Sequence, residues 1–239
     1  MRVERAPATV VVCCGVPSGI GPSDFAGWVN VAERARVPVS WAARPADLPT
    51  VLDVLGARTT PFDAAVALDA SQLSSRPTLR REIAAARAST GRIECAVAAG
   101  AAPLDHRALL VEQGIHTIAV GGFDAATRSS RRPPPSGWAC RSVVWGLWEV
   151  QTVTRPPRST VGRILPWAFG PHLPAGSLTV VHVEPGALGL RFARTKFERL
   201  TVWIARQADS VHAARLSDLQ SLLQAAGQRE TGSVLRRAA

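Results

Sequence analysis

Hydrophobic and polar positions follow two patterns that alternate along this chain. Short apolar runs rich in β-branched residues and alanine, bounded by Gly, Pro, Asp or Ser, are typical of buried strands. Longer segments with apolar residues at every third or fourth position are typical of helices with one buried face. The first pattern predicts strands over residues 9–14, 37–43, 64–70, 93–99, 115–122, 142–153, 177–185 and 211–216. The second predicts helices over residues 23–35, 45–57, 76–91, 105–114 and 193–209, with a last helix after residue 216.

The residue types at the helix ends support several of these boundaries. Ser23 is predicted to cap the first helix, because its hydroxyl can accept a hydrogen bond from a free backbone amide. Gly56 is predicted to close the second helix and Gly91 to follow the third, since glycine commonly ends helices. Repeated strand–helix units with apolar strands indicate a parallel sheet covered by helices. Periodicity alone leaves two arrangements open, a doubly wound sheet and a barrel.

The chain is long enough to bury a large core. Its 239 residues are 46% hydrophobic, which is typical of a globular protein. We expect a single domain over residues 1–239, with a core at about 8–225, loops at about 124–138 and 155–176, and a frayed C-terminal tail. No apolar stretch reaches the roughly 18–20 residues of a membrane helix. Glu4 interrupts the basic N-terminus and no small-residue cleavage site follows, so we expect no signal peptide and a cytoplasmic protein.

The charge of the chain is strongly positive, with a formal net charge of +10. Nearly all of the positive charge is arginine, and Lys196 is the only lysine. The densest cluster, TRSSRRPPPSG at residues 127–137, reads as an exposed loop without the aromatic residues of a single-stranded nucleic-acid platform. We therefore expect a solvated basic surface and no nucleic-acid partner. The sequence leaves the oligomeric state open.

A glycine-rich turn follows the first predicted strand. The stretch VVVCCGVPSGIG at residues 10–21 resembles the nucleotide turn of the short-chain dehydrogenases, Thr-Gly-x3-Gly-Ile-Gly. Cys14 stands in place of the threonine, and the remaining positions match: Gly15, Gly19, Ile20 and Gly21. This resemblance implies an NAD(P)-binding oxidoreductase. That family transfers hydride with a tyrosine and a lysine four residues on, whereas this chain contains no tyrosine.

A second resemblance covers more of the chain. The order of its elements is similar to the polysaccharide deacetylase (NodB homology) family, which implies a distorted seven-stranded β/α barrel. The stretches that carry it are VVCCGVPS (11–18), VPVSWAA (37–43), ALDAS (67–71) and GSLTVVHVEPGAL (176–188). It also accounts for the C-terminal third of the chain, which the dehydrogenase resemblance leaves unexplained.

The deacetylase resemblance assigns roles to particular positions. The family uses two aspartates after the first strand, a His-x3-His pair after the third and a histidine on the late strand, and its metal-activated water cleaves an acetyl group. Cys13 and Cys14 stand where the aspartates belong, and Asp69 lies in the region of the missing histidine pair. Only His182 matches the family as a catalytic residue, with Glu184 on the same face of its strand.

The resemblance also bears on ligands. Trp145, Trp148 and Glu184 are the candidate substrate-binding residues, and aromatic side chains at a barrel mouth bind the faces of sugars. Because Trp145 and Trp148 are three residues apart in a predicted strand, they face opposite ways, and we expect one of them in the core. We expect no metal cofactor, unless Cys14, Asp69 and His182 converge to hold zinc. The favoured hypothesis is a divergent deacetylase-like domain without metal-dependent activity, a pseudoenzyme that binds a glycan or a protein. The alternative is the dehydrogenase-like oxidoreductase that uses the turn at Gly15–Gly21.

Overall fold

The computed structural model describes residues 7–98, 104–120, 140–144, 146–153, 173–184 and 190–222. Its strands are β1 (Ala8–Gly15), β2 (Ser40–Ala43), β3 (Asp63–Leu68), β4 (Cys95–Ala98), β5 (Thr117–Val120), β6 (Cys140–Val144), β7 (Leu147–Val153), β8 (Leu178–Val183) and β9 (Val211–Ala214). Its helices are α1 (Pro22–Ala35), α2 (Leu48–Gly56), α3 (Ala70–Ser74), α4 (Arg76–Thr90), α5 (Leu104–Glu112) and α7 (Leu190–Arg206). Of the predicted segments, the loop at 124–138, most of the loop at 155–176, Trp145 and the C-terminal tail lie outside the described residues.

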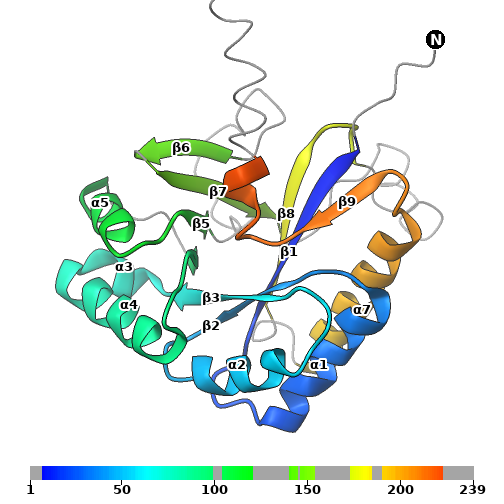
Figure 1. Cartoon of the computed structure of the whole chain (residues 1–239), viewed down its shortest axis with the longest axis horizontal. Coiled ribbons are helices and arrows are strands. Elements are labelled where there is room, and N and C mark those ends of the chain that lie inside the picture. The colour runs from blue at the N-terminus through cyan, green and yellow to red at the C-terminus, as the bar shows by residue number, and fades with distance from the viewer. Residues whose placement is uncertain are drawn as a thin grey trace, which may run out of the picture.

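Seven of the strands close into a barrel of parallel strands. β1, β2, β3, β4, β5, β7 and β8 pair in that order, and β8 pairs with β1 to complete the circle. Helices α1, α2, α4, α5 and α7 lie around the strands, as Figure 1 shows. The prediction of a seven-stranded β/α barrel is confirmed. The open doubly wound sheet, the other arrangement that periodicity left open, is not the fold of this chain.

The barrel is distorted where the chain begins. One edge of β1 pairs with β8 along almost its whole length, from Thr9 to Cys14. The other edge is shared, because residues 8–11 pair with β9 whereas residues 13–15 pair with β2. The C-terminal strand β9 therefore fills the gap between the beginning of β1 and β2.

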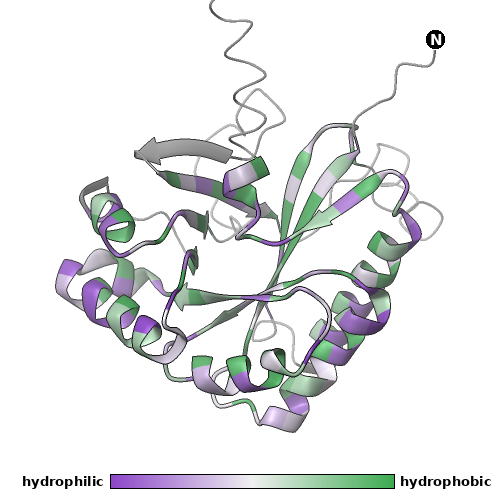
Figure 2. Ribbon diagram, viewed as in Figure 1, coloured by the Kyte–Doolittle hydropathy of each residue, from purple (hydrophilic) through white to green (hydrophobic). Residues whose placement is uncertain are grey.

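Alternation along the strands sorts their side chains into two layers. One face of every barrel strand contributes to a lumen filled mainly by small apolar side chains, including Val11, Ala42, Ala65, Val97, Ala119, Val150 and Val180. The opposite face packs against the helices in a larger core that includes Trp41 and Phe197, whose rings lie 5.6 Å apart. Figure 2 shows hydrophobic residues along the strands and mixed polarity along the helices.

The amino end of the barrel is closed by the segment after β9. Leu216 and Leu219 are buried among the lumen side chains. The backbone N–H of Leu216 donates to Ser40 Oγ at 2.7 Å, and the N–H of Ser217 donates to Asp63 Oδ2 at 2.9 Å. Ser40 and Asp63 are the first residues of β2 and β3, so the contacts lie where the strands begin.

Some predicted boundaries are wrong in detail. Gly21 occupies the N-cap position of α1 and Ser23 lies inside its first turn, because Pro22 already supplies a first residue that has no amide to satisfy. Helix α2 begins at Leu48, later than the predicted residue 45, and ends at Gly56 as expected. Gly91 does follow α4, with the left-handed φ of +70° that favours glycine.

The largest local correction concerns the predicted strand over residues 142–153. The chain instead forms an antiparallel pair, β6 and β7, with Gly146 between them at φ +84°. An apolar stretch on both sides of a single glycine has no local feature that distinguishes one long strand from a tight hairpin. β6 lies outside the closed barrel and pairs only with β7 among the described strands.

Candidate functional site

The candidate site is the mouth of the barrel, where the carboxyl ends of the parallel strands meet. Side chains that follow strand ends at this rim converge on one space, as in other parallel α/β folds. Cys13, Cys14, Asp69, His182 and Glu184 all lie at or just after such strand ends. Their orientations decide which of them share a site.

The two adjacent cysteines face different layers. Cys13 lies in the lumen cluster with Val11 and Val180, whereas Cys14 packs in the outer core with Phe25 and Trp41. Neither side chain has exposed surface. Burial raises the pKa of both thiols, and for Cys13 the nearby Asp63 carboxylate and Cys14 raise it further. Both thiols are therefore protonated at neutral pH in the metal-free chain, and their side chains point into different layers.

Asp69 is used as a helix cap. Its Oδ1 accepts hydrogen bonds from the backbone N–H of Gln72 at 2.9 Å and from the Ser71 hydroxyl at 2.6 Å. The Gln72 side chain in turn accepts from the Asp69 backbone N–H at 2.8 Å, which completes a capping box at the start of α3. The hydrogen bonds from Ser71 and Gln72 lower the pKa of Asp69. The residue thus has a local structural role at the rim.

His182 faces the lumen beside the first cysteine. It lies on the same face of β8 as Val180, and its Cα pairs in register with that of Cys13 on β1. Burial lowers its pKa, the Glu184 carboxylate raises it, and the Lys196 ammonium lowers it. His182, Glu184 and Lys196 are therefore close enough to interact electrostatically. A neutral imidazole at pH 7 both donates and accepts a hydrogen bond.

Trp148 does not join this group. Trp148 is half-buried against the lumen cluster near the start of β7, in register with Thr117, the first residue of β5. It therefore lies toward the amino end of the barrel, and the expectation that it lies at the mouth is wrong because the chain turns at Gly146. Trp145 lies outside the described residues.

Cys14, Asp69 and His182 do not form a ligand set for a divalent ion. Cys14 points into the helix layer, Asp69 is held in its capping box, and His182 faces the lumen. Throughout the residues that the structure describes, no group of three His, Cys, Asp or Glu side chains is placed to hold a metal ion. The condition for a zinc site, convergence of these three residues, is not met in the described part of the chain.

The glycine-rich turn is not arranged for a phosphate. The backbone N–H of Gly19 donates to Asp47 Oδ1 at 3.1 Å, so a carboxylate already occupies a donor that a phosphate would use. Asp24 adds a second negative charge in the first turn of α1. Together with the closed barrel, these contacts remove the basis for the dehydrogenase alternative.

Two charged residues that influence the lumen side chains were not predicted from the sequence. Lys196 lies on α7, and its ammonium acts electrostatically on His182. Asp63 lies at the beginning of β3, on the lumen face with Ala65, and burial raises its pKa while contacts with Ser40, Ser217 and Arg215 lower it. Asp63 could have been found from alternation, because it precedes Ala65 by two positions and so shares its face.

None of the described helices combines the length and the apolar character needed to cross a membrane.

Comparison with known proteins gives a consistent answer for the fold. No protein-family model and no curated protein sequence matches the chain. Among solved structures, a variant of the peptidoglycan deacetylase PdaC from Bacillus subtilis is similar, with a TM-score of 0.53 and 10% identity over 99% of this chain and 98% of that one. A protein assigned to the polysaccharide deacetylases and to O-antigen biosynthesis, from Bordetella bronchiseptica, is similar with a TM-score of 0.50 and 14% identity, over 90% of this chain and 89% of that one.

These similarities place the chain in a structural class. Its fold is that of the polysaccharide deacetylases, as the sequence resemblance predicted, whereas its sequence shares few residues with theirs. At identities of 10% and 14% the comparison carries the fold alone. The function of the chain depends on the side chains of its own site.

Proposed function

We propose that this chain is a carbohydrate-binding domain with the deacetylase fold that does not carry out metal-dependent deacetylation. The observation that carries the proposal is the pair Cys13 and Cys14 at the end of β1. The resemblance assigns two carboxylates to these positions, and the chain has two fully buried thiols that face opposite layers.

The loss of the metal chemistry follows from what each remaining group does. A metal-activated water requires ligands that are deprotonated and converge on one point. Burial keeps the thiols protonated, and the Asp69 carboxylate accepts two hydrogen bonds within its own capping box. His182 alone is too small a ligand set to hold a divalent ion in place.

The retained polar groups favour binding of a neutral, hydroxyl-rich ligand. His182, Glu184 and Lys196 offer hydrogen-bond donors and acceptors near the carboxyl end of β8. Sugar hydroxyls both donate and accept, so they match such a mixed set of groups. By analogy with the peptidoglycan deacetylase of the same fold, the glycan class to test first is an oligosaccharide of N-acetylglucosamine.

The absence of metal chemistry is tested on the full chain. The protein is incubated with zinc, cobalt or nickel, desalted, and assayed for bound metal and for acetate released from an N-acetylglucosamine tetramer. We expect substoichiometric metal and no acetate above the no-protein control. One metal per chain together with acetate release would overturn this part of the proposal.

Binding is tested separately by titration calorimetry with the same tetramer. We expect His182→Ala and Glu184→Gln each to weaken binding about tenfold, the effect of losing roughly 1.4 kcal/mol of contact energy. His212→Ala is the matched control, because His212 is an exposed histidine on β9. Equal affinities for the His182 and His212 variants, or no binding by the unmodified protein, would refute carbohydrate binding at the mouth and leave the metal result unaffected.

A further inference from the structure

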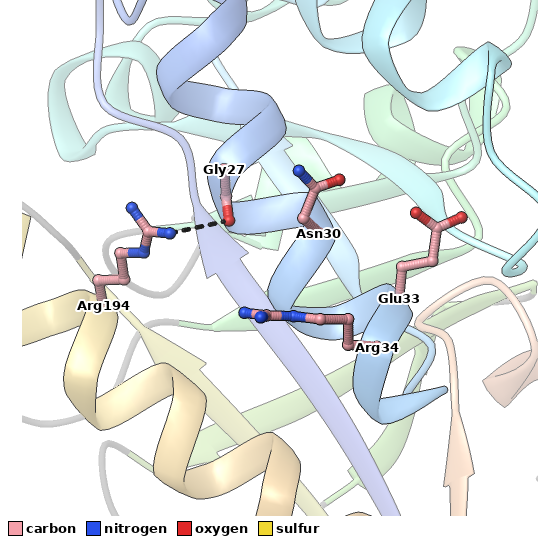
Figure 3. Close-up of a pocket in the computed structure, with 5 residues that line it drawn as sticks. All are labelled: Gly27, Asn30, Glu33, Arg34 and Arg194. Atoms are coloured by element: carbon pink, nitrogen blue, oxygen red, sulfur yellow. Dashed lines mark hydrogen bonds between the residues drawn. The ribbon is translucent and has the colours of Figure 1, made fainter.

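A cavity of about 360 Å³ lies on the outside of the barrel, between the first and last long helices. Gly27, Asn30, Glu33 and Arg34 line it from α1, and Arg194 lines it from α7 (Figure 3). The cavity is separate from the barrel mouth, because its lining comes entirely from the helix layer. No described lumen side chain lines it.

The acidic member of the lining is already neutralised. Glu33 Oε2 pairs with Arg58 Nη1 at 2.9 Å, and Glu33 Oε1 accepts from the Thr59 hydroxyl at 3.4 Å. Figure 3 shows the Glu33 side chain directed away from both Arg34 and Arg194. Its negative charge is therefore committed to Arg58 and does not balance the two arginines of the cavity.

The two arginines have no counter-ion among the described residues. Arg34 makes no ion pair with a described carboxylate, and the described contact of Arg194 is a hydrogen bond from Nη2 to the Gly27 carbonyl at 3.4 Å. Two exposed guanidinium groups that line one cavity without a balancing carboxylate give it a net positive charge, which favours a bound anion over a cation.

Asn30 also presents donors to the cavity. Its Oδ1 accepts from Arg58 Nη1 at 2.7 Å, so the amide oxygen is committed on the side of Glu33. The amide nitrogen lies on the opposite side, toward Gly27 and Arg194, as Figure 3 shows. Arg58 thus holds both Glu33 and Asn30 in orientations that leave N–H donors facing the cavity.

From this arrangement we propose that the α1–α7 cavity is a binding site for a small organic anion that carries a phosphate or carboxylate group. Guanidinium and amide N–H groups match the oxygens of such groups, and arginine binds them with two parallel hydrogen bonds. The volume is within the range of small-molecule pockets, about 300–1,000 Å³, so it accommodates a ligand larger than an inorganic ion, such as an acidic or phosphorylated sugar. The site is independent of the mouth and of glycan binding there.

The test is titration calorimetry with three sugars of similar size. Glucose 6-phosphate carries a phosphate, glucuronate carries a carboxylate and glucose carries neither, and all titrations use the same ionic strength set with NaCl. We expect one or both charged sugars to bind and glucose not to bind. The tighter of the two charged ligands identifies the anion class.

Variants on both helices assign any binding to this cavity. We expect Arg34→Gln and Arg194→Gln each to weaken the affinity about tenfold or more, and Asn30→Asp to weaken it further by replacing a donor with a negative charge. Arg199→Gln is the control, an exposed arginine elsewhere on α7. The same affinity in the Arg34, Arg194 and Arg199 variants, or no binding of either charged sugar, would overturn the proposal. Arg34 is exposed, so its variant remains informative even if a change at Arg194 disturbs the packing of the helices.

Discussion

The two ends of this barrel differ in how their polar groups are used. At the amino end, Ser40 and Asp63 accept hydrogen bonds from the segment that closes the lumen, and Leu216 fills the space between them. At the mouth, the Cys14 thiol is buried in the outer core and the Asp69 carboxylate caps α3. The difference indicates that contacts at the amino end contribute more to the stability of the closed barrel than those at the mouth.

The division is one of position along each strand, since in register His182 pairs with Cys13, Cys13 pairs with Ser40 and Ser40 pairs with Asp63. Ser40 and Asp63 begin β2 and β3, whereas His182 lies near the end of β8. Changes at the amino end should therefore cost stability, whereas changes at the mouth should cost less and affect ligands more. The following substitutions test this contrast, in order of decreasing expected effect.

Replacing Leu216 should have the largest effect. Leu216→Ala removes a fully buried side chain from the closed end of the lumen, and such substitutions cost about 2–5 kcal/mol. The free energy of unfolding is measured in urea. Leu222→Ala is the control, because that side chain is 37% exposed and its loss should change stability by about 0.5 kcal/mol or less. Similar losses for the two variants would mean that the segment after β9 does not close the lumen.

Removing the hydroxyl of Ser40 should have the next largest effect. Ser40→Ala leaves the buried N–H of Leu216 without its acceptor, which costs about 1–3 kcal/mol. Ser74→Ala, which removes an exposed hydroxyl bonded to the Ser71 carbonyl, should be nearly neutral. If thermal or urea unfolding gave Ser40→Ala the stability of the unmodified protein, the polar closure would be unimportant.

Removing the Asp69 cap should have a smaller effect at the mouth. Asp69→Ala deletes the acceptor of the capping box, a change that costs about 1 kcal/mol in typical helices. Its pKa is lowered in the folded chain, so its contribution is present above the ordinary value of 3.8 and is lost as the pH falls through the folded pKa. Urea unfolding at pH 7 and pH 3 measures this, with Asp53→Ala as an exposed control. A loss above 2 kcal/mol would place a major stabilising contact at the mouth.

The last test concerns only the pH dependence at the amino end. Burial raises the pKa of Asp63, so the unfolded chain releases this proton before the folded chain as the pH rises from 3.8. The unmodified protein should therefore lose stability relative to Asp63→Asn as the pH rises above that value. The asparagine side chain keeps an oxygen that can accept the hydrogen bond from the Ser217 N–H. The titratable groups that both proteins share cancel when one free energy of unfolding is subtracted from the other. A difference that stayed constant between pH 3.5 and 7 would contradict the raised pKa.

The strands and helices were largely predictable because their signals are local. Apolar runs gave most strands of the barrel to within a few residues, and Gly91 ends α4 as expected. The exception at Gly146 shows the limit. Two strands that pair with each other and one longer strand have the same apolar pattern, and only the position of their neighbours distinguishes them.

The candidate site was predictable in its residues and less so in its geometry. The resemblance identified Cys13, Cys14 and His182, and alternation implied that the cysteines face opposite sides. Neither the resemblance nor alternation placed Lys196 near His182, because α7 and β8 are brought together only by tertiary packing. Trp148 pairs with Thr117 toward the amino end of the barrel, a position that the predicted strand over residues 142–153 did not reveal.

The sequence by itself determined which segments become strands and helices, and which chemical groups stand at the end of β1. These properties depend on the periodicity and identity of neighbouring residues, which local interactions reveal. The tertiary structure alone decided that the sheet closes, that the segment after β9 seals one end, and that Arg34 and Arg194 face a common cavity. Such contacts join residues far apart in the chain, and their geometry depends on how all the strands tilt and pack together.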